Sequence, residues 1–202
     1  MNNVLLDSLP TEWNGYHLNT GYDIGIQLMQ VQYDNSLTEY EKSDIFLWLL
    51  FGDEDELRDH PSGEELAECF QWFINGWFHD NPDPDAQNER ARVVDYDVDQ
   101  WRIYADFRQI YGIDLAETDM HWWKFCGMLW NMPYRQSSFL QVVHTRQERP
   151  RTGASAEERQ NLIRRKKMYE LDQMEEKKEY TEKEKAAIDD FDRMMEERRG
   201  RK

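Results

Sequence analysis

The stretch Met120–Met132 reads MHWWKFCGMLWNM, and nine of its thirteen residues are apolar, three of them tryptophan. At about 100° per residue on a helix, its polar side chains His121, Lys124 and Asn131 fall on one narrow strip, so the rest of the helix surface must be buried. The run is well short of the ~20 residues that cross a bilayer. It therefore predicts the central helix of an all-α domain.

The ends of this helix are marked in the sequence. Thr118 or Asp119 can cap its start, and Pro133 cannot continue it. Applied along the chain, the same signals of capping residues, apolar periodicity and glycine or proline stops predict about six helices. These lie at about residues 22–33, 39–51, 63–78, 98–111, 120–132 and 138–146, with Ser137 or Ser138 as the cap of the last.

Two features of the N-terminal region shape this prediction. Asn14-Gly15 lies between Trp13 and Tyr16, and Asn-Gly is typical of the type I′ turn of a small β-hairpin. Gly21 and Gly25 weaken the signal for the helix at residues 22–33, because glycine inside a helix costs about 1 kcal/mol relative to alanine.

Charge divides the chain into unequal parts. Residues 1–146 hold 9 Lys+Arg and 26 Asp+Glu, whereas residues 147–202 hold 16 and 15, and all eight tryptophans lie before residue 131. We expect an acidic head at residues 1–146, a hinge at 147–154 and a charged tail at 155–202. An acidic head repels phosphate backbones and anionic membrane surfaces, so nucleic acid and membranes are not expected partners.

The tail at residues 155–202 is so rich in charged residues that its helices either project into water or form only against a partner. Ser155 with Glu158, and Thr181 with Glu184, form capping boxes that predict helices at roughly residues 156–179 and 182–198. Their apolar residues are too few for a core of their own, so we expect the tail to be partly disordered or to bind a partner helix. The candidate contacts are Leu162, Tyr169, Met174, Ile188, Phe191 and Met195.

The sequence offers no catalytic or metal signature. Its five histidines are not spaced to share a helical turn, and no glycine-rich phosphate loop occurs. Asp95-x-Asp97-x-Asp99 superficially resembles the start of an EF-hand, but Gln100 replaces the required glycine and Asp106 the final glutamate, so helix capping is the better interpretation. Both cysteines lie in apolar runs. We expect no cofactor, no metal and no enzymatic activity.

His121 and Lys124 form the polar strip of an otherwise buried helix, and two interpretations are open. They can contact a partner or neighbouring subunit. They can equally mark the edge of the helix that faces water, with the methylenes of Lys124 lying over Trp123 or Met128.

YGIDL at Tyr111–Leu115, MHWWKF at Met120–Phe125 and the arginine that closes the next helix resemble the bacteriophage gene-product-fifteen family. The resemblance covers most of residues 1–150. It transfers no established active site. The motif positions that it assigns are Asp114, His121, Trp122, Trp123, Lys124, Phe125 and Arg146.

The resemblance implies a role in phage tail assembly in the host bacterial cytoplasm. The expected role is a self-associating, non-enzymatic chaperone that binds the tape measure protein, with the tail tube protein as a second partner to consider. A tape measure protein is a long helix with apolar faces, and a soluble acidic helical protein suits the task of keeping it unaggregated. The alternative is a structural virion component, a tail or connector subunit.

Overall fold

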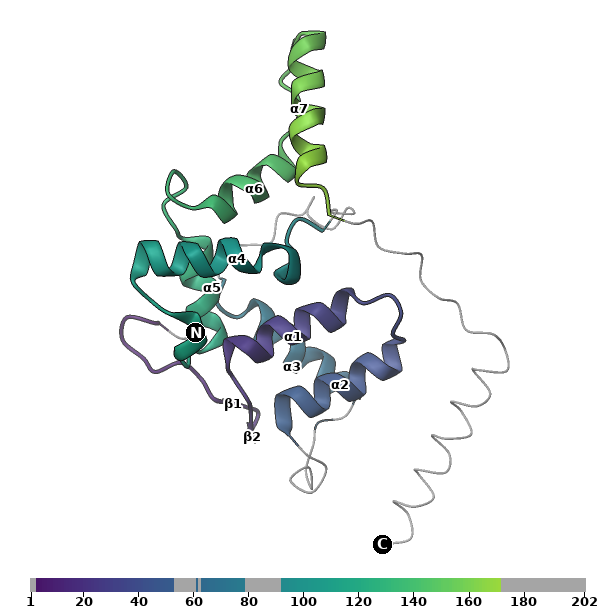
Figure 1. The fold of residues 1–202 in the computed structure, drawn as a ribbon. Helices are drawn as coiled ribbons and strands as arrows, with labels where there is room; N and C mark the ends of the chain where they lie inside the picture. The colour runs from purple at the N-terminus through teal and green to yellow at the C-terminus, as the bar shows by residue number, and fades with distance from the viewer. Residues whose placement is uncertain (1–2, 53–60, 62, 79–91, 172–202) are drawn as a thin grey trace, which may run out of the picture.

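Seven α-helices follow a two-stranded hairpin in this computed structural model, which describes residues 3–52, 61, 63–78 and 92–171 (Figure 1). An all-α fold with a small N-terminal hairpin is thereby confirmed, with α1 to α6 as the six expected helices of the head. The elements are β1 (Glu12–Trp13), β2 (Tyr16–His17), α1 (Tyr22–Tyr33), α2 (Glu39–Phe51), α3 (Gly63–Asn75), α4 (Tyr96–Asp106), a π-helical turn (Phe107–Tyr111), a 3-10 turn (Leu115–Glu117), α5 (Trp122–Trp130), α6 (Ser138–Gln147) and α7 (Ala156–Met168).

The hairpin turns where Asn-Gly predicts it. Asn14 has φ 48° and Gly15 has φ 89°, the positive values that a type I′ turn needs at both central residues. Trp13 pairs with Tyr16 across the turn. The adjoining chain then leads directly into α1.

Helices α1 and α5 begin side by side although about a hundred residues separate them in sequence. The N–H of Tyr22 donates to the carbonyl of Met120 at 2.8 Å, and the N–H of Trp122 donates to the carbonyl of Thr20 at 2.8 Å. This single antiparallel bridge satisfies two N–H groups at the helix starts that have no partner inside their own helices. It also fixes the position of α5 against α1.

The glycine in α1 has a packing function. A Cβ atom at Gly25 would overlap the indole ring of Trp122, and one at Gly76 would overlap that of Trp123. The two adjacent tryptophans of α5 therefore approach the backbone at two glycines on different elements. The helix forms at residues 22–33 as predicted although Gly25 weakens the local signal, and the close approach of Trp122 explains why glycine stands there.

Helix α5 is central, as its sequence predicts. Trp122, Trp123, Phe125, Cys126 and Leu129 are all buried. The ring of Phe125 stacks on that of Phe107 with centroids 5.2 Å apart, and on that of Tyr22 at 5.1 Å. Helices α1 and α3 contact this apolar helix directly, and the ring of Tyr96 at the start of α4 meets that of Trp122 edge-on.

Several helix boundaries differ from the sequence-based prediction, and α5 ends at Trp130 rather than at residue 132. His121 caps α5 in place of Thr118 or Asp119, because its ring nitrogen accepts the N–H of Trp123. Helix α4 begins at Tyr96, two residues early, since the Asp95 carboxylate caps it. Helix α3 ends at Asn75, before residue 78.

The C-terminal helix is also shorter than expected. The capping box of Ser155 and Glu158 is present, but α7 ends at Met168 rather than near residue 179. The carbonyl of Tyr169, the residue after it, is used outside the helix by Arg146. The predicted tail helix at 182–198 lies outside the described residues.

Replacing Gly25 with alanine should destabilise the protein by about 1–3 kcal/mol, because the new methyl group must displace the Trp122 ring. Gly127→Ala is the matched control, since Gly127 also lies in a helix but has open space at its Cβ position. That substitution should be neutral or stabilise by up to ~1 kcal/mol. Urea unfolding of both variants measures the difference, and equal midpoints would contradict this packing.

Candidate functional site

Five of the seven motif positions lie on α5 or at its start, and the other two, Asp114 and Arg146, lie before α5 and at the end of α6. His121, Trp122, Trp123 and Phe125 lie in or against the core of the head, and only Lys124 among the seven is exposed. Asp114 and Arg146 make separate contacts, away from α5. The structure therefore groups five motif residues on one helix but does not gather all seven into a site.

The tryptophan pair joins α5 to the end of α3. The indole Nε1 of Trp123 donates to the carbonyl of Phe73 at 2.7 Å, and that of Trp122 donates to the carbonyl of Ile74 at 3.4 Å. Both carbonyls belong to the last turn of α3, where no residue of the same helix can satisfy them. Each indole thus fills the core and completes a helix end.

His121 is a structural residue rather than a free base. Its Nδ1 accepts the N–H of Trp123 at 3.0 Å, so its Nε2 carries the hydrogen and donates to the carbonyl of Pro10 at 2.9 Å. Burial lowers the pKa of His121, although the Pro10 contact opposes this in part. The expected edge to water is therefore correct for Lys124 and wrong for His121, which is half-buried with both ring nitrogens in use.

Asp114 orders the chain between α4 and α5. Its carboxylate caps the 3-10 turn by accepting the N–H of Ala116 at 3.1 Å. Both carboxylate oxygens also accept the hydroxyl of Tyr104 at 3.2 Å, and this hydrogen bond raises the pKa of Tyr104. Arg108 lies 3.8 Å away, at the edge of ion-pair range. Asp114 thereby holds an aromatic side chain of α4 in place.

Arg146 forms the most buried ion pair of the described residues. Its Nη1 and Nη2 donate to the two carboxylate oxygens of Asp99 at 2.6 and 3.0 Å, and the side chains are 6% and 0% exposed. The remaining donors reach the carbonyls of Val93 at 2.8 Å and Tyr169 at 2.7 Å. One guanidinium thus joins the end of α6, the start of α4 and the residue that follows α7.

A second buried carboxylate, Asp106, holds the other end of α6. It accepts the hydroxyl of Ser137 at 2.7 Å and the N–H groups of Ser138 and Phe139 at 3.1 and 2.9 Å. A carboxylate at a helix N-terminus also meets the positive end of the helix dipole. Asp99 and Asp106 lie two turns apart on α4, so α4 and α6 run antiparallel and are fastened at both ends.

Sequence reasoning missed Asp99 and Asp106 as core residues. Both were noticed only as positions of an imperfect EF-hand, and capping was the assigned role. Asp95 does cap α4, accepting the N–H groups of Asp97 and Val98. Arg146 was the one sequence feature that could have indicated a buried acid on another helix. An arginine at the end of an apolar helix needs an acidic partner if it is buried.

Two of the six candidate partner-binding residues of the tail, Leu162 and Tyr169, lie within the described residues. Leu162 is 6% exposed, whereas its neighbour Ile163 is 65% exposed, and Met168 is 70% exposed. Tyr169 is half-buried, with its ring 5.7 Å from the guanidinium carbon of Arg102. Partner binding by these residues stays a prediction. The other four candidates lie outside the described residues, namely Met174, Ile188, Phe191 and Met195.

The described residues show no arrangement typical of catalysis. Burial raises the pKa of Cys69 to about 12 and the pKa of Cys126 well above its usual value, so both thiols stay protonated at neutral pH. No group of three or more His, Cys, Asp or Glu side chains in this part of the chain could hold a metal ion. No helix within it is long and apolar enough to cross a bilayer.

An apolar cavity of about 220 Å³ lies beside α5. Asn75 brings the only side-chain amide among its lining residues, and burial raises the pKa of the Tyr96 hydroxyl that borders it. A site for a polar ligand would need several convergent polar groups, which these lining residues do not supply. The cavity is bordered mainly by Met29, Ile74, Trp77, Val94, Trp122 and Trp130.

Comparison with known proteins places the motif in a family. The sequence model described as Bacteriophage Gp15 protein matches residues 1–171. The chain belongs to the bacteriophage Gp15 family. The match runs past the 1–150 range expected from the motifs and includes all of α7. No curated protein and no solved structure matches the chain.

Membership of the Gp15 family indicates a phage structural or assembly protein. The positions that the resemblance assigns to the motif place the α5 tryptophans, cap α5 and bind α6 to α4. In this Gp15 family member those contacts are structural.

Substituting Arg146 with methionine should destabilise the fold by about 3–5 kcal/mol, because it leaves the Asp99 carboxylate buried without its counter-ion. Arg149→Met, an exposed arginine three residues on, is the matched control and should change stability little. The double variant Asp99→Asn with Arg146→Met should be more stable than Arg146→Met alone, since no charge stays unpaired. Strictly additive losses in urea unfolding would contradict a direct pair.

Stability should depend on pH through His121. Because the folded-state pKa is lowered from the ordinary 6.5, the unfolded chain binds the proton first as pH falls, so stability decreases below about pH 6.5 and levels off below the folded-state pKa. His121→Asn keeps an acceptor for the Trp123 N–H and should remove this contribution. The exposed His144→Asn is the control. Identical pH dependence in all three proteins would show that His121 is not the cause.

Proposed function

We propose that this Gp15 family member is a non-enzymatic tail assembly chaperone that binds the tape measure protein in the host cytoplasm. The observation that carries the proposal is α7, a helix that lies within the matched family region and extends away from the head (Figure 1). It is fastened at one end only, where Arg146 binds the carbonyl of Tyr169 and Lys166 reaches the carbonyl of Glu148.

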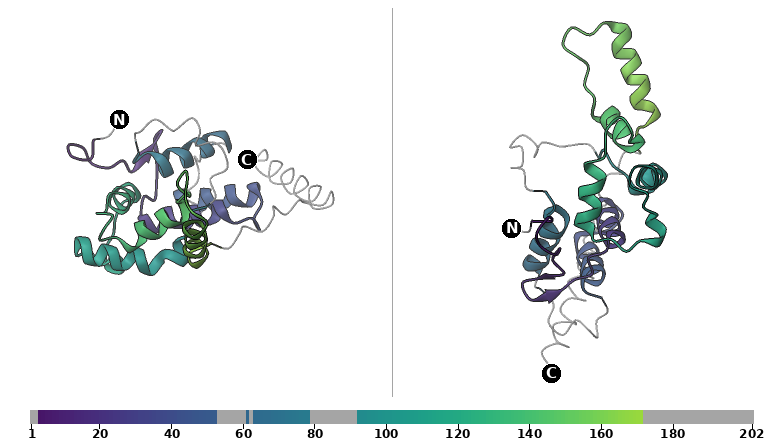
Figure 2. Two further views of the ribbon diagram at one scale, coloured as in Figure 1. Left: turned by 90° about the horizontal axis from the view of Figure 1, so that it is seen from above. Right: turned by 90° about the vertical axis from the view of Figure 1, so that its left-hand side faces the viewer.

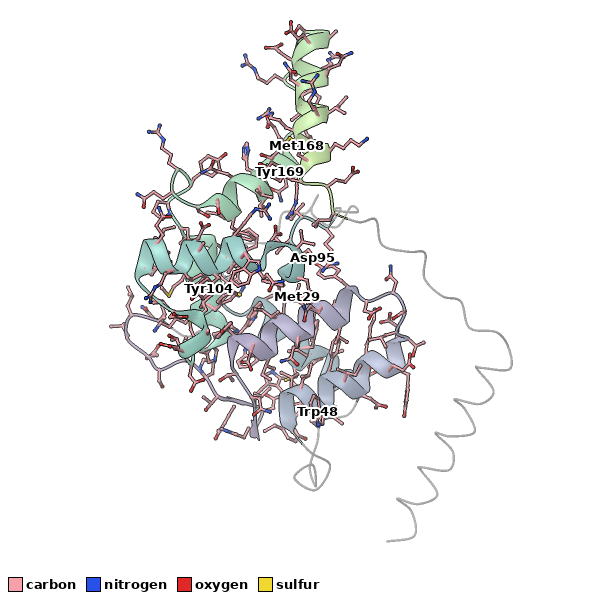
Figure 3. All side chains as sticks on the ribbon, in the orientation of Figure 1. Met29, Trp48, Asp95, Tyr104, Met168 and Tyr169 are labelled. Atoms are coloured by element: carbon pink, nitrogen blue, oxygen red, sulfur yellow. The ribbon has the colours of Figure 1, made fainter. Side chains whose placement is uncertain are left out.

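The outer face of α7 has the composition of a helix-binding surface. Ile163 and Met168 are exposed in its C-terminal half, about 140° apart around the helix, while Leu162 is buried. Figure 3 labels Met168 at the end of α7. Arg164 and Lys167 lie on the same outer side, since they follow Leu162 by about 200° and 140° at helical spacing. Exposed apolar side chains beside long flexible cations can lie against an amphipathic partner helix of varied sequence.

The acidic head supports this role in a different way. The chain carries a net charge of −16, and such self-repulsion keeps an assembly with an aggregation-prone partner in solution. A tape measure protein presents long apolar faces before the tail tube surrounds it, so a chaperone needs both a helix-binding surface and a soluble body. The chain offers both, one on α7 and one on the head.

Co-expression of the full chain with a tagged tape measure protein tests the proposal. The double variant Ile163→Ser with Met168→Ser should reduce co-purification by roughly tenfold or more, because each large apolar side chain contributes about 1.5–3 kcal/mol when buried, before ordering costs. Melting temperature should not change, since both side chains are exposed. Gln160→Ser with Asn161→Ser, exposed polar residues of the same helix, is the matched control.

Mass spectrometry of purified virions separates this function from a structural one. A chaperone should be absent from finished particles although it forms a complex with the tape measure protein during assembly. Recovery of the chain at a fixed copy number per particle would instead establish a tail or connector subunit. Equal capture by the wild type and the α7 double variant would remove α7 as the binding surface.

A further inference from the structure

The outward face of α4 carries the most exposed of the eight tryptophans. Trp101 is 73% exposed, Val98 is 54% exposed, and Ala105 is exposed beside them. Helix α4 lies at the outer edge of the molecule in both views of Figure 2. With Arg108, whose side chain is 59% exposed, these residues follow the 3-4-3 spacing of a coiled-coil seam. The opposite face of α4 is buried in the head through Asp99, Ile103 and Asp106.

Trp101 contacts one aromatic side chain of its own helix. Its ring meets that of Tyr104 edge-on, with centroids 5.9 Å apart and an interplanar angle of 82° (Figure 3 labels Tyr104). The Tyr104 hydroxyl is in turn bound by both oxygens of Asp114. An exposed tryptophan with restricted motion loses little entropy when it is buried, and tryptophan is among the commonest anchors of protein interfaces.

The spacing of this face fits a second copy of the same helix in antiparallel orientation. If the two-fold axis passes beside residue 103, Trp101 lies opposite Ala105 of the second copy, and Val98 lies opposite Arg108 of the second copy. The large Trp101 then packs against the small Ala105 at two places, because the two-fold axis repeats each contact between the two copies. The aliphatic part of Arg108 can cover Val98 while its charge stays at the edge.

Charge selects the antiparallel orientation over the parallel one. Asp97 is exposed in the first turn of α4, and Arg108 lies just after its last turn. Antiparallel pairing places each Arg108 beside Asp97 of the other copy, whereas parallel pairing would place like charges together. Both side chains are exposed, although Asp97 accepts a hydrogen bond from Gln30 at 2.7 Å and Arg108 lies 3.8 Å from Asp114.

We propose that α4 is a self-association surface, which pairs two copies of this protein through Val98, Trp101, Ala105 and Arg108 about a two-fold axis. This surface is distinct from the outer face of α7 and does not depend on tape measure binding. Two helices of about three turns bury an area at the low end for specific interfaces, so the dimer should form in a concentration-dependent way.

Sedimentation velocity of the full chain over a range of concentrations is the first test. The wild type should pass from monomer to dimer, and Trp101→Glu and Ala105→Glu should each weaken the dimer by roughly tenfold or more. Asn161→Glu, which adds the same charge to an exposed position of α7, should leave dimerisation unchanged. At a concentration where the wild type is monomeric, thermal melts of the α4 variants should match the wild type, because both residues are exposed.

A charge exchange tests the orientation. Asp97→Arg and Arg108→Asp should each prevent dimerisation, since each homodimer would contain two like-charge contacts. Mixing the two variants should restore a dimer, because both contacts of the mixed pair then join opposite charges. A wild type that stays monomeric at its highest soluble concentration, a Trp101→Glu variant that dimerises normally, or a mixture that stays monomeric would each overturn the proposal. If the wild type stays monomeric and Trp101→Glu no longer captures the tape measure protein, this face of α4 binds the tape measure protein instead.

Discussion

Two adjacent tryptophans on one helix impose the constraint on which this fold depends. Consecutive residues of a helix point about 100° apart, so no single neighbouring helix can cover both Trp122 and Trp123. The protein resolves this by placing α1 on one side, where Gly25 admits the first indole, and α3 on the other, where Gly76 admits the second. Both indole N–H groups then find carbonyls at the end of α3.

The rest of the head is attached to this centre by buried charge. Asp99 and Asp106 are both buried on α4, and every oxygen of these carboxylates accepts at least one hydrogen bond. Lys42 is buried as well, with its ammonium group 3.1 Å from the carbonyl of Gln32. A charged side chain is buried only where a donor or acceptor of the protein pairs with it, because an unpaired buried charge costs several kcal/mol. Buried polar contacts of this kind define how α4 and α6 meet.

The positions that the resemblance assigns to the motif make contacts of packing, capping and ion pairing. The exposed apolar side chains of the described residues lie elsewhere, and they include Val98 and Trp101 on α4 and Ile163 and Met168 on α7. Trp101 is 73% exposed and Met168 is 70% exposed. Apolar patches that are larger than scattered single residues mark interaction sites on many proteins. An assembly protein with two such faces can bind its own copies through one and a partner through the other.

The sequence by itself determined the class of fold and most helices, because apolar periodicity, capping boxes and an Asn-Gly turn are local signals. It also identified the family, since the MHWWKF run and the closing arginine lie at fixed places along the chain. Only the tertiary structure decided that Arg146 pairs with Asp99 and that Gly25 makes room for the Trp122 ring. It also showed that His121 caps α5 with both ring nitrogens hydrogen-bonded. It also decided that Leu162 is covered while Trp101 is exposed. These outcomes depend on residues 47 to 111 positions apart, or on which side of a helix meets a neighbour, and no local pattern records either.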